Sequence, residues 1–198
     1  MTEATLRADT ARQEVARATW AVVEREGLTG ASMREIAREA GCTTGVLTHY
    51  FRDKDELMLF AFSLAFEAAA ARMTARAQRG DDPRRALTAV LEEALPLDTQ
   101  RRIEATIYFG FLDVARRDAR LGEEFRRRHA TWRTLVTRLV REVTGVGATE
   151  AGTRADLLLV AVDGIASSAL ADPQHFSEAR QRALLRRTRD GLVGPDRA

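Results

Sequence analysis

Hydrophobic and polar positions along the chain repeat at a helical period, and no stretch alternates strictly between apolar and polar residues. In residues 12–26, Val15, Val22 and Val23 fall on one face, and Gly27 ends the pattern. Spacings of three, four and seven residues place side chains on one side of an α-helix. The pattern therefore predicts a first helix over 12–26 and an all-α protein.

Turn and capping residues divide the rest of the chain into further helices, about nine in all. Ser32 with Glu35 three residues later is a capping box, which predicts a short helix that starts at Met33 and ends at Gly41. Glycine, aspartate and proline breaks separate the later segments. These further helices are expected at about 43–51, 52–79, 83–95, 98–117, 121–144, 149–171 and 177–191.

The expected helices are short before Asp53 and longer after it. Three of them occupy only about 40 residues at the N-terminal end. We therefore predict a small N-terminal module over residues 1–52 and a larger helical body over residues 53–198, joined by a shared helix.

The charge balance gives no general argument for nucleic-acid binding. The 198 residues include 31 basic and 29 acidic side chains, a net charge of +2, and every basic residue except Lys54 is arginine. Up to Met58 there are eight basic and ten acidic residues, which makes the N-terminal module about −2. A DNA-binding function must therefore depend on local features of the sequence.

Several functional classes have no support in the sequence. The one cysteine, Cys42, excludes an internal disulfide and a Cys-rich metal site, and the three histidines lie far apart. A Gly-rich phosphate loop and a Ser–His or Cys–His constellation are both missing, so we expect no enzyme activity, metal or cofactor. The polar residues 1–10 and the short apolar run 157–162 predict a cytoplasmic protein without membrane contact.

Residues 33–51 have the layout of a helix-turn-helix. Ala37 lets two helices cross closely, Gly41 permits a tight turn, and Val46 with Leu47 is expected to return to the core. In this motif the second helix enters the major groove of DNA. The alternative is a short helical pair within a helical adapter that contacts proteins and not DNA.

The second helix of the pair carries no charge between Cys42 and Phe51. Its threonine methyls and hydroxyls, with an imidazole and a phenol, can contact thymine methyls, base edges and phosphates. Lys54 follows at the start of the next helix, where its ammonium and the positive helix N-terminus can hold a phosphate.

The sequences GLTGASMREIA (27–37), AGCTTGVLTHYF (40–51) and KDEL (54–57) closely resemble the N-terminal domain of TetR/AcrR-family transcriptional regulators. The C-terminal part resembles the BetI-type subgroup more loosely, at LPLD (95–98), VDGI (162–165) and ADP (171–173). This resemblance implies an all-α homodimer, in which the first three helices bind DNA and the others bind an effector and the partner subunit.

By position, the resemblance also implies which residues contact DNA. Many members have tyrosine where this chain has Thr48, so the phosphate contact there would be shorter or absent, and we expect Tyr50 to compensate. The implied DNA-binding set is Ser32 and Arg34 on the backbone, Thr43, Thr44, Thr48, His49 and Tyr50 on the second helix, and Lys54 as a phosphate clamp.

Aromatic residues gather between Phe60 and Trp132, where they form either a core or the wall of a small-molecule pocket. Glu104 lies one helical turn before Tyr108, and a carboxylate beside aromatic rings would favour a cationic ligand. The candidate ligand-binding residues are Glu104, Tyr108, Phe109, Leu112, His129 and Trp132.

The last two predicted helices carry apolar and small residues in excess of what one packed face requires. A two-fold, four-helix interface would cover them. Asp163 falls within this run, and we expect it to pair with an arginine across the interface. The candidate interface residues are Leu158, Val162, Ile165, Ala169, Ala183 and Leu184.

The sequence thus predicts a ligand-responsive, DNA-binding transcriptional regulator, most simply a repressor that a small-molecule effector releases from a palindromic operator. Its expected partners are double-stranded DNA, a second copy of the chain and an effector that the sequence does not identify. The sequence does not distinguish a repressor from an activator.

Overall fold

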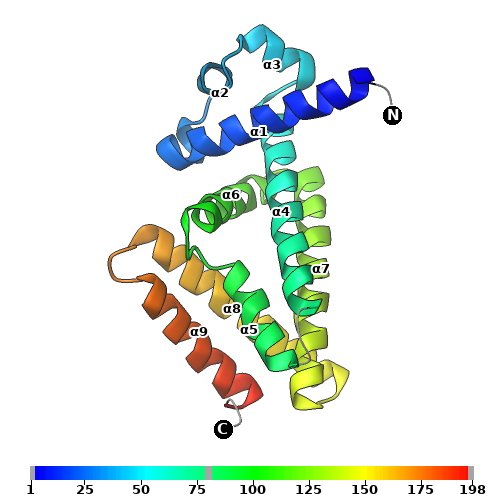
Figure 1. Ribbon diagram of the computed structural model, residues 1–198, viewed down its shortest axis with the longest axis vertical. Coiled ribbons are helices and arrows are strands. Elements are labelled where there is room, and N and C mark those ends of the chain that lie inside the picture. Colours follow the sequence, from blue (N-terminus) through cyan, green and yellow to red (C-terminus); the bar gives the residue numbers. More distant parts are fainter. Residues whose placement is uncertain (1–2, 79–81, 196–198) are drawn as a thin grey trace.

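The computed structural model describes residues 3–78 and 82–195, which form nine helices and no strand (Figure 1). The predicted all-α fold class is confirmed. The Gly80–Asp81 part of the predicted break after the fourth helix lies outside the described residues. The helices are α1 (Glu3–Gly30), α2 (Met33–Glu39), α3 (Thr44–Tyr50), α4 (Lys54–Gln78), α5 (Pro83–Glu93), α6 (Thr99–Ala115), α7 (Ala119–Thr144), α8 (Ala148–Ala171) and α9 (Glu178–Val193).

Side-chain caps explain where several helices begin. The Ser32 hydroxyl accepts a hydrogen bond from the Glu35 backbone N–H at 3.2 Å, as the capping box predicts. The Glu35 carboxylate pairs with Arg38 and does not complete the reciprocal bond of a full capping box. Asp98 and Asp118 cap α6 and α7 in the same way as Ser32 caps α2.

The first helix is longer than its periodicity predicts, because it starts at Glu3 instead of residue 12. Gly27 has a φ of 69° and interrupts the helical backbone, and a short helical stretch continues to Gly30. A positive φ is inexpensive only for glycine. Gly27 therefore ends the regular part of α1, as its position in the sequence indicates.

The three N-terminal helices lie at one end of the elongated molecule (Figure 1), and only α2 and α3 are short as predicted, because α1 has 28 residues. Their core is an apolar cluster that includes Val22, Ile36, Leu47 and Phe51, all 1 % exposed or less. Val46 is an exception to the prediction, because 45 % of it is exposed although we expected it in the core. On a helix this short only one side faces the core, and Leu47 fills that side.

Two connections join the N-terminal helices to the body. The first is α4, which leaves the N-terminal end and runs down into the body (Figure 1). Trp20 of α1 donates a hydrogen bond from Nε1 to the Ala61 carbonyl of α4 at 3.2 Å. The second is α6, which packs on α1 and places Ile107 and Phe111 in the N-terminal cluster. A displacement in the body therefore has two routes to the N-terminal helices.

A second apolar cluster holds the body together and draws on α4, α5, α7, α8 and α9. The α4 helix is long and apolar enough to cross a membrane by length and composition alone. However, α4 packs against α1, α5 and α6, and its buried residues belong to both clusters. We therefore interpret α4 as a core helix.

Candidate DNA interface and effector cavity

The α3 helix presents uncharged polar side chains to solvent. Its first turn is capped by Thr43, whose Oγ1 accepts a hydrogen bond from the Val46 N–H at 3.4 Å. The hydroxyl hydrogen of Thr43 can therefore still be donated to another group. Thr44, Thr48 and His49 are exposed. The α3 helix therefore offers methyl groups, hydroxyls and an imidazole, but no charge that would repel DNA phosphates.

The other residues of the implied DNA-binding set lie on α2, at the end of α3 and at the start of α4, all at the same end of the molecule as α3 (Figure 1). Ser32 and Arg34 are exposed at the start of α2, and the half-buried Tyr50 contacts the His49 ring edge-on at 5.3 Å between centroids. Lys54 is half-buried at the first position of α4. The structure thus brings the whole set to one end of the folded molecule.

The prediction from sequence missed one residue of this surface. Val46 lies one helical turn after Thr43, and its exposure gives α3 an apolar group at the surface that faces away from Leu47. Helical spacing from Thr43 was the signal that could have identified it. An exposed valine on such a helix suits contact with a thymine methyl group.

A cavity of about 180 Å³ lies in the body between α4, α5, α6, α7 and α8. Of the six predicted ligand-binding residues, Glu104, Tyr108, Phe109 and Trp132 lie on its wall. Several wall residues were not predicted. They include Phe62, Phe66, Met73, Glu93, Arg101 and Asp163.

The other two predicted residues, Leu112 and His129, do not line the cavity, and their contact with a ligand stays a prediction. In the turn of α6 that follows Tyr108, Phe111 stacks on Phe62 of α4 with the ring centroids 3.9 Å apart. The His129 ring packs against Phe125 and meets the Trp132 ring edge-on, at 5.8 Å in each case. His129 therefore supports the cavity wall from outside.

Asp163 lies on the wall of the cavity. The Tyr108 hydroxyl donates to its Oδ2 at 3.4 Å, across from α6 to α8. Burial raises the pKa of Asp163 to about 6, and the hydrogen bond from Tyr108 offsets only part of that effect. Burial, together with the charge of Asp163, also raises the pKa of Tyr108. The pairing of Asp163 with an arginine across an interface stays a prediction.

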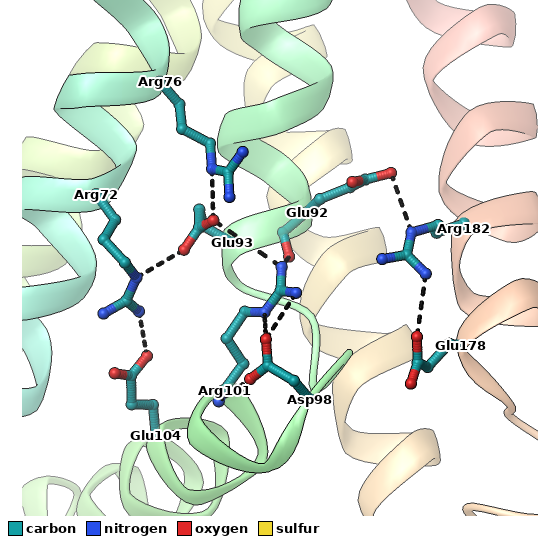
Figure 2. Close-up of polar contacts among 9 residues, drawn as sticks. All are labelled: Arg72, Arg76, Glu92, Glu93, Asp98, Arg101, Glu104, Glu178 and Arg182. Atoms are coloured by element: carbon teal, nitrogen blue, oxygen red, sulfur yellow. Dashed lines mark hydrogen bonds and ion pairs between the residues drawn. The ribbon is translucent and has the colours of Figure 1, made fainter.

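A network of charged side chains joins α4, α5 and α6 beside the cavity (Figure 2). Glu93 accepts from Arg72 at 2.8 Å and from Arg76 at 2.6 Å, and Arg72 also reaches Glu104 at 2.5 Å. Burial raises the pKa of Glu93, but the hydrogen bonds and charges of the two arginines outweigh it, so the pKa is lowered. The ion pair with Arg72 also balances the negative charge of Glu104.

The predicted interface stripe on α8 lies inside a single chain. Leu158, Val162, Ile165 and Ala169 are 8 % exposed or less, and the first three belong to the core cluster of the body. The chain's own core already covers them, and their role in an interface stays a prediction. On α9, Ala183 and Leu184 are half-buried, and Leu184 packs against the same cluster.

The opposite side of α8 carries the exposed apolar surface. Leu157 is 50 % exposed and Val160 is 70 % exposed. At Gly164, an added Cβ would meet nothing within 4 Å. We call the surface formed by Leu157, Val160 and Gly164 the outer face of α8. Large exposed apolar residues beside a small one are typical of a face that another helix covers.

A helix-turn-helix module at one end of a helical body defines the class of DNA-binding regulatory proteins. Two family models match the chain: "Bacterial regulatory proteins, tetR family" over residues 16–60, and "BetI-type transcriptional repressor, C-terminal" over residues 83–194. The chain belongs to the TetR family of DNA-binding transcriptional regulators, which are not enzymes.

Relatives and solved structures agree with this assignment. The regulator PksA of Bacillus subtilis (strain 168) is 31 % identical over 178 residues, 88 % of this chain and 85 % of that protein. A transcriptional regulator from Rhodococcus sp. Rha1 superposes with a TM-score of 0.85 at 34 % identity and covers 94 % of this chain and 98 % of its own. A putative regulator from Saccharomonospora viridis, solved with choline, shares the fold at a TM-score of 0.80 and 20 % identity, over 89 % and 94 % of the two chains.

Proposed function

We propose that the protein is a repressor that binds a palindromic operator as a homodimer and leaves it when a small molecule occupies the cavity. The observation that supports this most directly is the position of the cavity. It is walled by α4 and α6, the two helices that also contact the N-terminal DNA-binding helices. We place the chain in the cytoplasm, where its DNA is, and divide it into a DNA-binding domain (1–52) and an effector-binding and dimerisation domain (53–198).

The ring of Phe62 gives this coupling a physical route. Phe62 on α4 lines the cavity and stacks on Phe111 of α6 with an interplanar angle of 5°. A ligand that displaces Phe62 shifts α4 against α6, and α4 carries Lys54 at its other end. Two recognition helices on one operator must stay about 34 Å apart. A coupling free energy of about 1–3 kcal/mol between the sites changes DNA affinity 5- to 150-fold.

The dimer in this proposal forms through the outer face of α8. The exposed Leu157 and Val160 supply apolar area, and Gly164 lets a second helix approach closely. A two-fold axis through this face makes each contact occur twice. Ala183 and Leu184 on α9 are retained as half-buried candidates at the edge of the interface.

On DNA, each α3 helix occupies the major groove with Thr43, Thr44, Thr48, His49 and Tyr50 as its contact residues. Ser32, Arg34 and Lys54 contact the phosphate backbone. The effector is a small organic molecule. Support for this comes from the Saccharomonospora viridis regulator, whose structure of the same fold contains choline.

The experiment for this function measures DNA binding by the full chain, first to the DNA upstream of its own gene and then to sites selected from random sequence. We expect a specific, salt-sensitive complex of a dimer, which compounds from a broad library dissociate. If the chain binds no DNA specifically, the alternative of a protein-interaction adapter is favoured. If it binds DNA but no compound in the library releases it, the effector part of the proposal is wrong.

Replacing Lys54 by alanine is expected to weaken binding to all DNA sequences equally. A lysine that holds one phosphate contributes about one unit to the slope of log K against log salt concentration. We therefore expect Lys54→Ala to flatten that slope by about one unit, measured by fluorescence anisotropy. The matched control is Arg85→Ala, which removes a cation from α5 at the far end of the body (Figure 1). Equal effects of the two substitutions would show that Lys54 makes no specific phosphate contact.

A further inference from the structure

Three exposed arginines at the DNA-binding end of the molecule are each paired with a glutamate. In the free chain these glutamates hold cations that DNA phosphates would otherwise attract. An arginine can move to a phosphate only if its glutamate releases it, so the number of bonds in each pair matters. The pairs are Arg25–Glu39, Arg38–Glu35 and Arg52–Glu56.

Two of these arginines are held by more than one bond. Arg25 contacts Glu39 at 3.0 Å and also Glu26 at 3.2 Å. The Glu56 carboxylate accepts from the backbone N–H of Arg52 at 2.9 Å and from its Nε at 3.0 Å. These bonds lower the pKa of Glu56, so the carboxylate stays charged. Arg25 and Arg52 therefore serve the fold of the N-terminal helices.

Arg38 is held more loosely than the other two. Among the described residues it makes one ion pair, from a single guanidinium nitrogen to Glu35 three residues earlier on α2. The Arg38 side chain is 70 % exposed. Exposed pairs of this kind contribute little to stability, so a stronger anion can take Arg38 from Glu35 at small cost.

A shallow surface hollow lies beside Arg38, between α2 and the start of α3. Arg34 also lines it, and the spacing of four residues places both arginines on the same side of α2. Thr43 and Thr44 bring two hydroxyl groups to the hollow from α3. Guanidinium and hydroxyl groups are donors suited to the oxygens of a phosphate.

The position of the hollow fits the path of a DNA strand. In a helix-turn-helix the first helix crosses the DNA backbone while the second lies in the major groove. Here α2 and α3 form the end of the molecule, and α1 lies between them and the body (Figure 1). A strand that meets Arg34 at the start of α2 therefore passes Arg38 one helical turn later.

We propose that Arg38 is a further phosphate contact of the DNA-binding surface, and that Glu35 restrains it in the free chain. On DNA, Arg38 exchanges the Glu35 carboxylate for a phosphate at the edge of the hollow. This exchange rests on the DNA-binding part of the proposed function and requires neither the effector nor the dimer.

The test measures DNA binding by the full chain with fluorescence anisotropy over a range of salt concentrations. It uses two labelled duplexes, one of mixed sequence and one that the natural chain selects from random sequence. One phosphate contact contributes about 0.9 unit to the slope of log K against log salt concentration, and we expect Arg38→Ala to lose that amount. The natural chain then gains about eightfold more affinity than the variant for each tenfold dilution of salt. The loss should be the same on both duplexes, because phosphates carry no sequence information.

Two further variants separate a phosphate contact from a structural role. Arg38→Lys keeps the cation and should keep the slope of the natural chain. Arg25→Ala removes another exposed arginine that pairs with α2, but from the side of α1, and should leave the slope unchanged. Melts by circular dichroism should place Arg38→Ala within about 2–4 °C of the natural chain, since the lost pair is exposed.

The variant Glu35→Gln tests the restraint. It removes the charge that holds Arg38 and leaves the backbone N–H that caps Ser32 in place. We expect DNA affinity to rise about two- to fivefold, which is the range that an exposed ion pair allows. Combined with Arg38→Ala, the same substitution should raise affinity less, because no arginine is left to release.

Several outcomes would contradict the proposal. An unchanged slope in Arg38→Ala, or an equal change in Arg25→Ala, would show that Arg38 makes no phosphate contact. A loss confined to the selected duplex would make Arg38 a base contact instead. If Glu35→Gln has the same effect with and without Arg38, Glu35 does not restrain it. In all these cases the natural chain still binds DNA and the proposed function stands, whereas a natural chain that binds neither duplex would contradict that function itself.

Discussion

Replacing Glu93 by alanine is expected to lower the free energy of unfolding by about 2–4 kcal/mol and the melting temperature by about 5–15 °C. The Glu93 side chain is 2 % exposed and accepts hydrogen bonds from Arg72 and Arg76. Its removal takes from Arg76 the carboxylate it pairs with and leaves Arg72 with Glu104 alone. The two arginine side chains are 35 % and 44 % exposed, so water recovers part of the loss. We therefore place the expected effect about 1 kcal/mol below the range of about 3–5 kcal/mol for fully buried pairs.

The matched control for this substitution is Glu123→Ala. Glu123 pairs with Arg126 at 2.7 Å on α7, and both side chains are at least two-thirds exposed. Exposed pairs contribute about 0–1 kcal/mol, so this variant should melt within about 2–4 °C of the natural chain. Thermal melts by circular dichroism at neutral pH make the comparison. If the two variants lose the same stability, the Glu93 network does not hold α4, α5 and α6 together.

The pH dependence gives the same network a second signature. The pKa of Glu93 in the folded chain is lowered, so its contribution to stability is fully present above the pKa of the unfolded chain. That contribution disappears as the pH falls through the lowered pKa of the folded state. The stability difference between the natural chain and Glu93→Gln should therefore be largest at neutral pH and shrink in acid.

The sequence predicted the helix-turn-helix well because local chemistry determines it. Ser32 forms a hydrogen-bonded cap, and Gly41 adopts a φ of 65°, which only glycine takes readily. Leu47 is fully buried as expected. Each of these features depends on neighbours within a few residues. The wrong assignment of Val46 to the core shows the limit, since on the seven-residue α3 helix Leu47 faces the core and Val46 lies on the exposed side.

The cavity and the dimer face were harder to predict, because they depend on contacts between helices far apart in the chain. Glu104 was expected to attract a cation, but Arg72, on another helix, neutralises it. Asp163, which was expected at an interface, lies on the cavity wall and accepts a hydrogen bond from the Tyr108 hydroxyl of α6. On α8 both sides carry apolar residues, and periodicity does not say which side meets the chain's own core.

The outer face of α8 leads to the largest expected effect on function. Replacing Val160 by glutamate is expected to convert the dimer into a monomer and to weaken operator binding at least 100-fold. Val160 is 70 % exposed in the single chain, so the new carboxylate is hydrated there and the fold is unaffected. In the dimer the two-fold axis buries two such carboxylates close together. Removing each from water costs several kcal/mol.

The loss of DNA affinity follows from the loss of the second recognition helix. When two linked modules bind one site, the overall affinity exceeds that of one module by about 10²–10⁴. A monomer keeps one α3 helix and one Lys54, and loses that gain. Sedimentation velocity measures the assembly state and fluorescence anisotropy measures operator binding. Ala71→Glu places the same charge on an exposed position of α4 and should leave both unchanged. A Val160→Glu chain that still sediments as a dimer would place the interface elsewhere on the body, because two unpaired carboxylates cannot be buried at one axis without that cost.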